Sequence, residues 1–174
     1  VWLWHTLHDH EHALILEPRF GDLACALVNA YRRSGFTPHM TAAVFDRRYL
    51  PDTDYIFDET MTAAEVEEIA VQSAGQYDII SAGCYLDELP VKDIMAAIEQ
   101  LYGLLAEGGV LILPVRNPSS AYELAYIMNM GRRNKYCGEG EVTAFTSIPY
   151  DELLFALHVH PYLNKYKIHV VSFA

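Results

Sequence analysis

The hydrophobic and polar positions of this chain alternate between short apolar runs and stretches of helical spacing. Residues 79–82 and 110–115 are mostly apolar, which is typical of strands buried on both faces of a sheet. The apolar residues of a helical face lie between them: Val91, Ile94, Ile98, Leu101 and Leu105. We therefore expect two neighbouring strands joined by a crossover helix, which begins near Pro90 and ends at Gly108 and Gly109.

The first part of the chain has the same order of strand and helix. Residues 12–17 form a short apolar run that ends in Glu17. Residues 22–34 then carry one apolar helical face, and Gly35 is placed to stop that helix. The pattern predicts a strand, a tight turn and a helix.

Further elements are predicted before and after the strand, helix and strand of residues 79–115. A second strand is predicted over residues 40–46 and a third over residues 53–59, and both end in carboxylates. Thr62 and Glu65 have the spacing of a capping box, so a helix is expected from there to Gly75. The later pattern predicts a helix over 117–131, a strand over 142–146, a short helix over 149–157 and a terminal strand over 166–173.

Strands that alternate with helices and are apolar on both faces predict an α/β fold. We expect a doubly wound, mostly parallel sheet of six or seven strands, with helices on both faces and the strand at Ile79 beside the strand at Ile112. Ligands of such sheets bind beyond the carboxyl ends of the strands. The residues that follow each strand are therefore the candidates for a functional site.

Length, composition and charge narrow the class of protein. A length of 174 residues with 52% hydrophobic residues fits a single domain over residues 1–174, and the start without methionine is compatible with a domain cut from a longer chain. The net charge of −11 argues against a nucleic-acid surface and favours a small-molecule or protein partner. Three cysteines far apart fit reduced thiols in a cytoplasmic protein. No apolar run approaches a membrane span, so no membrane partner is expected.

Two segments carry a resemblance to a known family, YDIISAGCYLDELP from Tyr77 and LLAEGGVLILPVRNP from Leu104. An aspartate-led apolar strand, a short acidic loop, a helix and a leucine, leucine, x, x, glycine, glycine turn into a strand resemble the fourth and fifth strands of class I S-adenosylmethionine-dependent methyltransferases. The resemblance implies a three-layer Rossmann-like sandwich. It also implies an antiparallel C-terminal edge, because the order of elements after residue 141 resembles the family's closing section.

The resemblance implies S-adenosylmethionine as cofactor and assigns roles to the residues at the strand ends. Glu17 and Gly21 match the turn that admits the methionine part, and Asp46 matches the carboxylate that holds the ribose hydroxyls. The loop after the fourth strand supplies three more candidates for the cofactor pocket: Gly83, Cys84 and Tyr85.

Each of these sites also has a purely structural interpretation. Glu17 and Gly21 fit a turn and a helix start, and Asp46 fits a solvated strand end. Asp58 and Glu59 either lie near the adenine ring or simply precede the cap at Thr62, and the cap is the preferred interpretation.

The turn after the first strand departs from the family pattern. The segment EPRFGDLA contains one glycine where the family has three at alternate positions, and it adds Pro18 and Phe20. Glycine serves such turns because a backbone without Cβ adopts positive φ and approaches a ligand closely. Two alternatives therefore stay open: a methyltransferase-like domain without cofactor that acts as a scaffold or partner-binding module, and another α/β transferase such as a nucleotide-sugar enzyme.

Histidines provide the remaining candidate chemistry. If the segment HTLHDHEH were extended, His8, His10 and His12 would project from one face and could share a zinc ion, but the spacing matches no known metal-binding pattern, and we expect no metal. No catalytic residue is identified. A hydroxyl acceptor of the methyl group would need a base, for which His158, His160 and Asp87 are the candidates.

Overall fold

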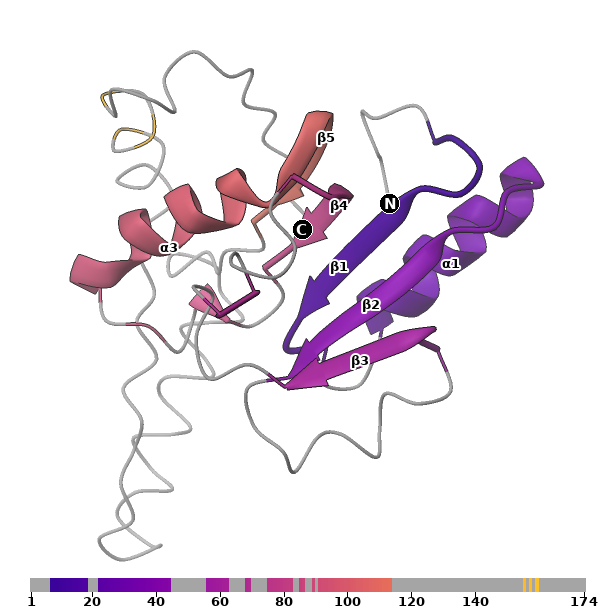
Figure 1. Cartoon of the computed structure of the whole chain (residues 1–174), viewed down its shortest axis with the longest axis horizontal. Coiled ribbons are helices and arrows are strands. Elements are labelled where there is room, and N and C mark those ends of the chain that lie inside the picture. Colours follow the sequence, from indigo (N-terminus) through magenta and orange to yellow (C-terminus); the bar gives the residue numbers. More distant parts are fainter. Residues whose placement is uncertain are drawn as a thin grey trace, which may run out of the picture.

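A computed structural model of the chain shows a parallel sheet with helices packed against it (Figure 1). It describes residues 7–18, 22–44, 56–62, 68–69, 75–82, 85–86, 89, 91–113, 155, 157 and 159. The elements in chain order are β1 (His12–Leu16), α1 (Asp22–Ser34), β2 (His39–Val44), β3 (Glu59–Thr62), β4 (Tyr77–Ser81), α3 (Val91–Gly103) and β5 (Leu105–Ile112).

The sheet of the described residues has five strands in the order β3-β2-β1-β4-β5, and every neighbouring pair is parallel. The strand order reverses between β1 and β4, which makes their junction the topological switch point of a doubly wound sheet. The predicted α/β Rossmann-like fold and the pairing of the strands at Ile79 and Ile112 are confirmed. The expected sixth and seventh strands and the antiparallel C-terminal edge lie outside the described residues.

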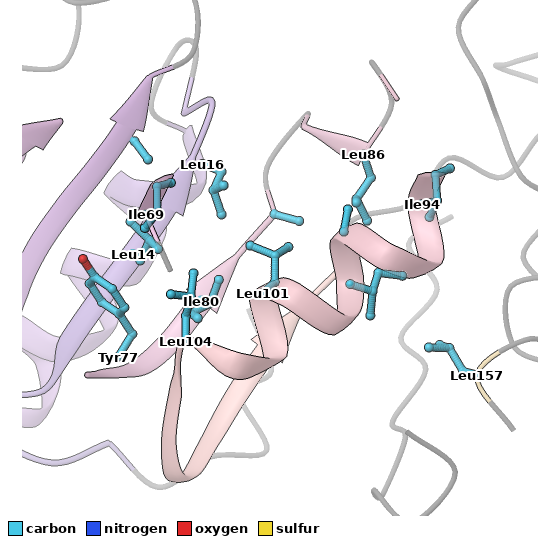
Figure 2. Packing of buried hydrophobic residues seen from close by; sticks show 14 residues of the cluster. Leu14, Leu16, Ile69, Tyr77, Ile80, Leu86, Ile94, Leu101, Leu104 and Leu157 are labelled. Atoms are coloured by element: carbon cyan, nitrogen blue, oxygen red, sulfur yellow. The ribbon is translucent and has the colours of Figure 1, made fainter. Parts of the chain in front are cut away.

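The two faces of the sheet bury separate clusters because side chains alternate along each strand. Leu14 and Leu16 of β1 pack in the cluster beneath α3, as Figure 2 shows together with Leu101 of that helix. Ala13 and Ile15 of β1 pack in the cluster beneath α1. Each large aliphatic side chain buried in this way contributes about 1.5–3 kcal/mol. Helices therefore cover both faces, as the apolar pattern predicts.

Helix α1 ends as the sequence indicates. Gly35 has a φ of 76°, and its amide donates to the Arg32 carbonyl, while the Phe36 amide donates to the Tyr31 carbonyl. These two bonds form a Schellman motif, in which glycine takes the left-handed position.

The end of α3 and the start of β5 differ from the prediction. The helix ends at Gly103, so Gly108 and Gly109 lie within β5 and Leu105 is the first residue of that strand. The pairing shifts from Tyr77↔Leu105 to Ile79↔Val110, and Gly108 adopts a φ of 82° at this irregularity. Gly103 thus ends the helix. Gly108 and Gly109 lie at the bulge in β5.

Strand β3 also differs from the prediction, which placed a strand over residues 53–59. The strand covers Glu59–Thr62, and Asp58 precedes it. Asp58 donates its amide to the Met40 carbonyl and accepts the Met40 amide on Oδ2, at 2.9 and 2.8 Å. This places Asp58 at the amino edge of the sheet, away from the ligand-binding edge, so the adenine interpretation is wrong. The aromatic residues of 53–59 favour a strand, but the segment that pairs with β2 is the more polar one that follows.

Candidate functional site

The carboxyl ends of β1 and β4 define the candidate site, because they flank the switch point (Figure 1). Ile15 of β1 is the register partner of Ser81, the last residue of β4. Glu17 directly follows β1. The two polar residues therefore stand on adjacent strands at the edge where ligands of this fold bind.

Glu17 is a buried carboxylate in an unusual backbone conformation. It is 1% exposed, its Oε2 atom is buried, and its φ is 44°. Its amide donates to the Ala43 carbonyl at 2.9 Å, which extends the pairing of β1 with β2 by one bond. A residue other than glycine pays about 1–3 kcal/mol for a left-handed conformation. Glu17 itself thus makes the sharp turn out of β1, although the segment after it has a single glycine.

Ala82 and Tyr85 follow β4 and are held by backbone hydrogen bonds. The Ala82 amide donates to the Ile112 carbonyl at 3.0 Å, and the Tyr85 amide donates to the Ala82 carbonyl at 2.9 Å. Tyr85 is partly buried and packs against the cluster beneath α3. Both described members of the predicted site, Glu17 and Tyr85, follow strand ends that meet at the switch point.

The other predicted site residues lie outside the described residues and stay predictions. They are the cofactor candidates Gly21, Asp46, Gly83 and Cys84 and the candidate bases Asp87, His158 and His160. Asp46 stands two positions after the last residue of β2.

Ser81 is a polar residue of this edge that sequence reasoning missed. Within the described residues, four polar or charged side chains are buried: Glu11, Glu17, Thr41 and Ser81. Ser81 is 1% exposed. The available signal was a single hydroxyl in the otherwise apolar run that follows Asp78.

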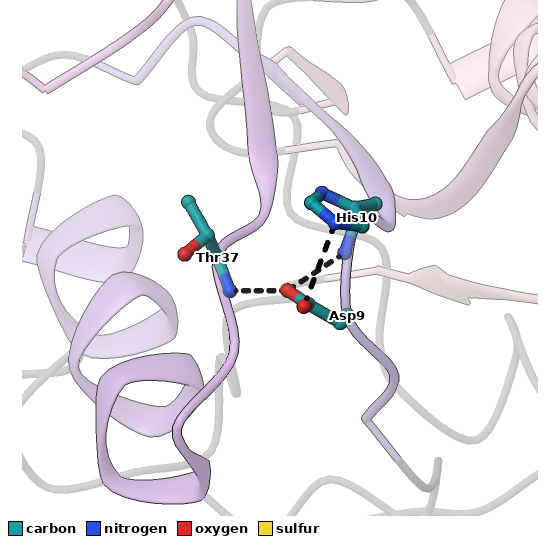
Figure 3. A network of polar contacts seen from close by, with 3 residues as sticks. All are labelled: Asp9, His10 and Thr37. Carbon is teal, nitrogen blue, oxygen red and sulfur yellow. Dashed lines mark hydrogen bonds and ion pairs between the residues drawn. The ribbon is translucent and has the colours of Figure 1, made fainter.

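The opposite edge of the sheet holds polar contacts that join the starts of the strands. Asp9 Oδ1 accepts the amides of Thr37 and His10 at 2.7 and 3.1 Å (Figure 3), and the bond from Thr37 lowers the pKa of this carboxyl. The Tyr31 hydroxyl donates to Glu11 Oε2 at 2.5 Å. Burial, followed by this hydrogen bond to the carboxylate, raises the pKa of Tyr31. These contacts stabilise the fold and lie away from the switch point.

Between His8 and His12 the histidine segment is not extended, in contrast to the arrangement that a shared zinc ion would require. His10 has a φ of 61° in a turn, and β1 begins only at His12. The part of the chain that the structure describes contains no group of three or more His, Cys, Asp or Glu side chains that could hold a metal ion. His5 lies outside that part. None of the described helices is long and apolar enough to cross a membrane.

No protein-family model and no curated protein sequence matches the chain. Among solved structures, it is similar to a SAM dependent methyltransferase from Archaeoglobus fulgidus, with a TM-score of 0.61 and 12% identity over 86% of this chain and 59% of that chain. It is also similar to the CurJ carbon methyltransferase, with a TM-score of 0.52 and 16% identity over 73% of this chain and 34% of that chain. The chain therefore spans about three fifths of the first protein and about one third of the second. At these identities the likeness defines the fold, which is that of class I S-adenosylmethionine-dependent methyltransferases.

Proposed function

We propose that this chain binds S-adenosylmethionine beyond the carboxyl ends of β1 and β4 and transfers its methyl group to a small-molecule or protein acceptor. The observation that carries the proposal is Glu17, a buried carboxylate directly after β1 at the switch point of a methyltransferase-like sheet. An anion at this place suits the cationic groups of the cofactor. When bound, the cofactor supplies the reactive methyl carbon.

The role of the protein residues in this proposal is to bind and orient. Glu17 pairs with the ammonium group of the amino-acid end, and Asp46 accepts hydrogen bonds from the two ribose hydroxyls. Tyr85 and the neighbouring residues Gly83 and Cys84 line the pocket. Correct orientation of the two reactants lowers the barrier by about 7 kcal/mol or more, so a binding site of this kind contributes directly to the rate.

The competing function is a methyltransferase-like scaffold without cofactor. The observation that favours it is the 1% exposure of Glu17, because a ligand meets that carboxylate only by replacing the atoms that cover it. The two functions differ in a property that needs no knowledge of the methyl acceptor, namely affinity for the adenosyl cofactor.

Calorimetric titration with S-adenosylhomocysteine, with a matched pair of glutamate variants, tests the proposal. Glu17→Gln should weaken binding about 10- to 100-fold, the value of a hydrogen bond to a charged group. Glu11→Gln is the control, because Glu11 is also buried, at 6% exposure, but precedes β1 at the opposite edge. Its affinity should equal that of the wild type. A wild-type chain that gives no binding heat with saturating ligand rejects the enzyme and favours the scaffold.

A further inference from the structure

His39, the first residue of β2, faces two carboxylates with its two ring nitrogens. Its Nδ1 atom lies 3.8 Å from Asp58 Oδ2, and its Nε2 atom lies 3.5 Å from Glu59 Oε1. Glu59 is the first residue of β3, the outermost strand on this side of the described sheet, and Asp58 directly precedes it. A single imidazole ring therefore connects the start of β2 with two consecutive carboxylates of the edge strand.

The protonation state of His39 decides how many of these contacts are favourable. A neutral imidazole has one N–H donor and one acceptor nitrogen, so it can donate to only one of the carboxylates. Its acceptor nitrogen then faces an oxygen that also has only lone pairs. An imidazolium donates from both nitrogens and carries a positive charge, which suits both carboxylates at once. Histidine in an unfolded chain changes between these states at about pH 6.5.

The other titratable groups around His39 favour a single positive charge at this place. Within the described residues, the starts of the neighbouring strands bring five such side chains near it: Glu11, His12, Asp58, Glu59 and Asp78. Four of them are carboxyl groups, which attract a positive charge. The fifth is His12, whose ring centroid lies 5.1 Å from that of His39, so the two rings repel each other when both are charged. One positive charge on this pair of rings is therefore favoured over two.

We propose that His39 is a pH-sensitive clamp that holds the edge strand β3 against β2. In mild acid its imidazolium binds Asp58 and Glu59 together, and at higher pH the neutral ring releases one of them. The contribution is complete below about pH 6.5 and is lost as the pH rises above that value. The side chains of His39, Asp58 and Glu59 are 36%, 53% and 63% exposed, so protons reach the ring from solvent and the effect is that of a surface ion pair.

Two backbone amides beside the clamp report on it. The Asp58 amide donates to the Met40 carbonyl at 2.9 Å, and the Met40 amide donates to Asp58 Oδ2 at 2.8 Å. Both bonds open when β3 separates from β2. The Ala82 amide, which donates to the Ile112 carbonyl at 3.0 Å where β4 lies beside β5, is the internal reference.

Amide hydrogen exchange of the wild type and matched variants from pH 5.5 to 8 tests the proposal. After correction for intrinsic exchange rates, protection of the two reporter amides relative to Ala82 should be about two- to fivefold higher at pH 5.5 than at pH 8. His39→Gln, whose side chain does not titrate, should show no such difference. His10→Gln is the matched control, because His10 Nε2 also lies 3.5 Å from a carboxylate, that of Asp9, but its side chain is 86% exposed and precedes β1. It should keep the wild-type pH dependence.

Each outcome either supports the clamp or overturns it. A relative protection that stays constant from pH 5.5 to 8 in the wild type would overturn the proposal, and so would a pH dependence that persists in His39→Gln, because another group would then cause it. If that variant folds poorly, Glu59→Gln removes the carboxylate at Nε2 alone and should reduce the wild-type difference; an undiminished difference counts against the clamp. No cofactor takes part in these measurements, so their result is independent of the proposed function.

Discussion

Two buried glutamates lie directly before and directly after β1, and their different surroundings give them different roles. Glu11 precedes the strand and is hydrogen-bonded to the Tyr31 hydroxyl, and its backbone carbonyl accepts the His39 amide at 2.8 Å. Glu17 follows the strand at the switch point and takes a left-handed conformation. The bonds of Glu11 join elements at the amino edge, so this residue serves the fold. Glu17 is the candidate for binding because it lies at the carboxyl edge beside the switch point.

Replacement of Tyr31 by phenylalanine should change both the stability and its dependence on alkaline pH. Tyr31 is fully buried, and loss of its hydroxyl removes a hydrogen bond to a buried carboxylate, at a cost of about 1–3 kcal/mol. Because folding raises the pKa of Tyr31, its contribution is complete below the unfolded value of about 10 and is lost as the pH rises above it.

Urea unfolding of the wild type and Tyr31→Phe between pH 7 and 11 checks this expectation. The difference in free energy of unfolding between the two proteins should shrink above about pH 10, since only the wild type has this phenol to ionise. Tyr77→Phe, which replaces another buried tyrosine, serves as the control. A difference that stays constant up to pH 11 would contradict the role of Tyr31 ionisation.

At the scale of elements, Gly103 and Gly109 differ in the space around them. A Cβ on Gly109 would lie 3.0 Å from the Asp78 carbonyl oxygen, because β5 passes close to β4 at the bulge. Gly103, the last residue of α3, has open space around the corresponding position. The bulge therefore depends on the absence of a side chain at Gly109, whereas the helix end tolerates one.

Alanine substitution at the two glycines should give opposite effects. Gly109→Ala should lower the free energy of unfolding by about 1–3 kcal/mol through overpacking against β4. Gly103→Ala should raise it by up to about 1 kcal/mol, since alanine loses less backbone entropy in a helix. Chemical unfolding of both variants measures these changes. Equal destabilisation by both would mean that the close approach at the bulge is unimportant.

The wrong sequence predictions concern segments in which two local signals indicate different structures. The strands β1, β2 and β4 were predictable because doubly buried strands have continuous apolar runs, and α1 because Gly35 marks its end. The start of β5 was missed because Gly103 and Gly108 both resemble helix stops, and tertiary pairing decides between them. Glu17 could be selected from the strand-end rule, whereas Ser81 required the register with β1 to show its position.

At the scale of the whole molecule, the amino edge and the carboxyl edge of the sheet hold different polar residues. At the amino edge, aspartates accept amides from neighbouring strands: Asp78 Oδ2 accepts that of His12 at 2.9 Å, and Asp58 Oδ2 accepts that of Met40 at 2.8 Å. These bonds join the starts of the strands and stabilise their order. The carboxyl edge, where the strand order reverses, holds Glu17 and Ser81. These side-chain bonds between strands thus lie at one edge of the sheet, and the proposed binding site lies at the other.

A ligand that binds only the folded chain must raise the stability of the whole molecule, which provides a final prediction. At a concentration of S-adenosylhomocysteine one hundred times its Kd, binding should add about 2.7 kcal/mol to the free energy of unfolding. For a chain of this size that corresponds to a Tm increase of roughly 5–10 °C. Differential scanning calorimetry with increasing ligand measures the shift. Glu17→Gln should need a higher ligand concentration for the same increase, whereas Glu11→Gln, with a Tm of its own, should show the wild-type dependence on ligand. A Tm that does not change at any ligand concentration would mean that the fold is retained without its cofactor, and that the chain serves as a scaffold.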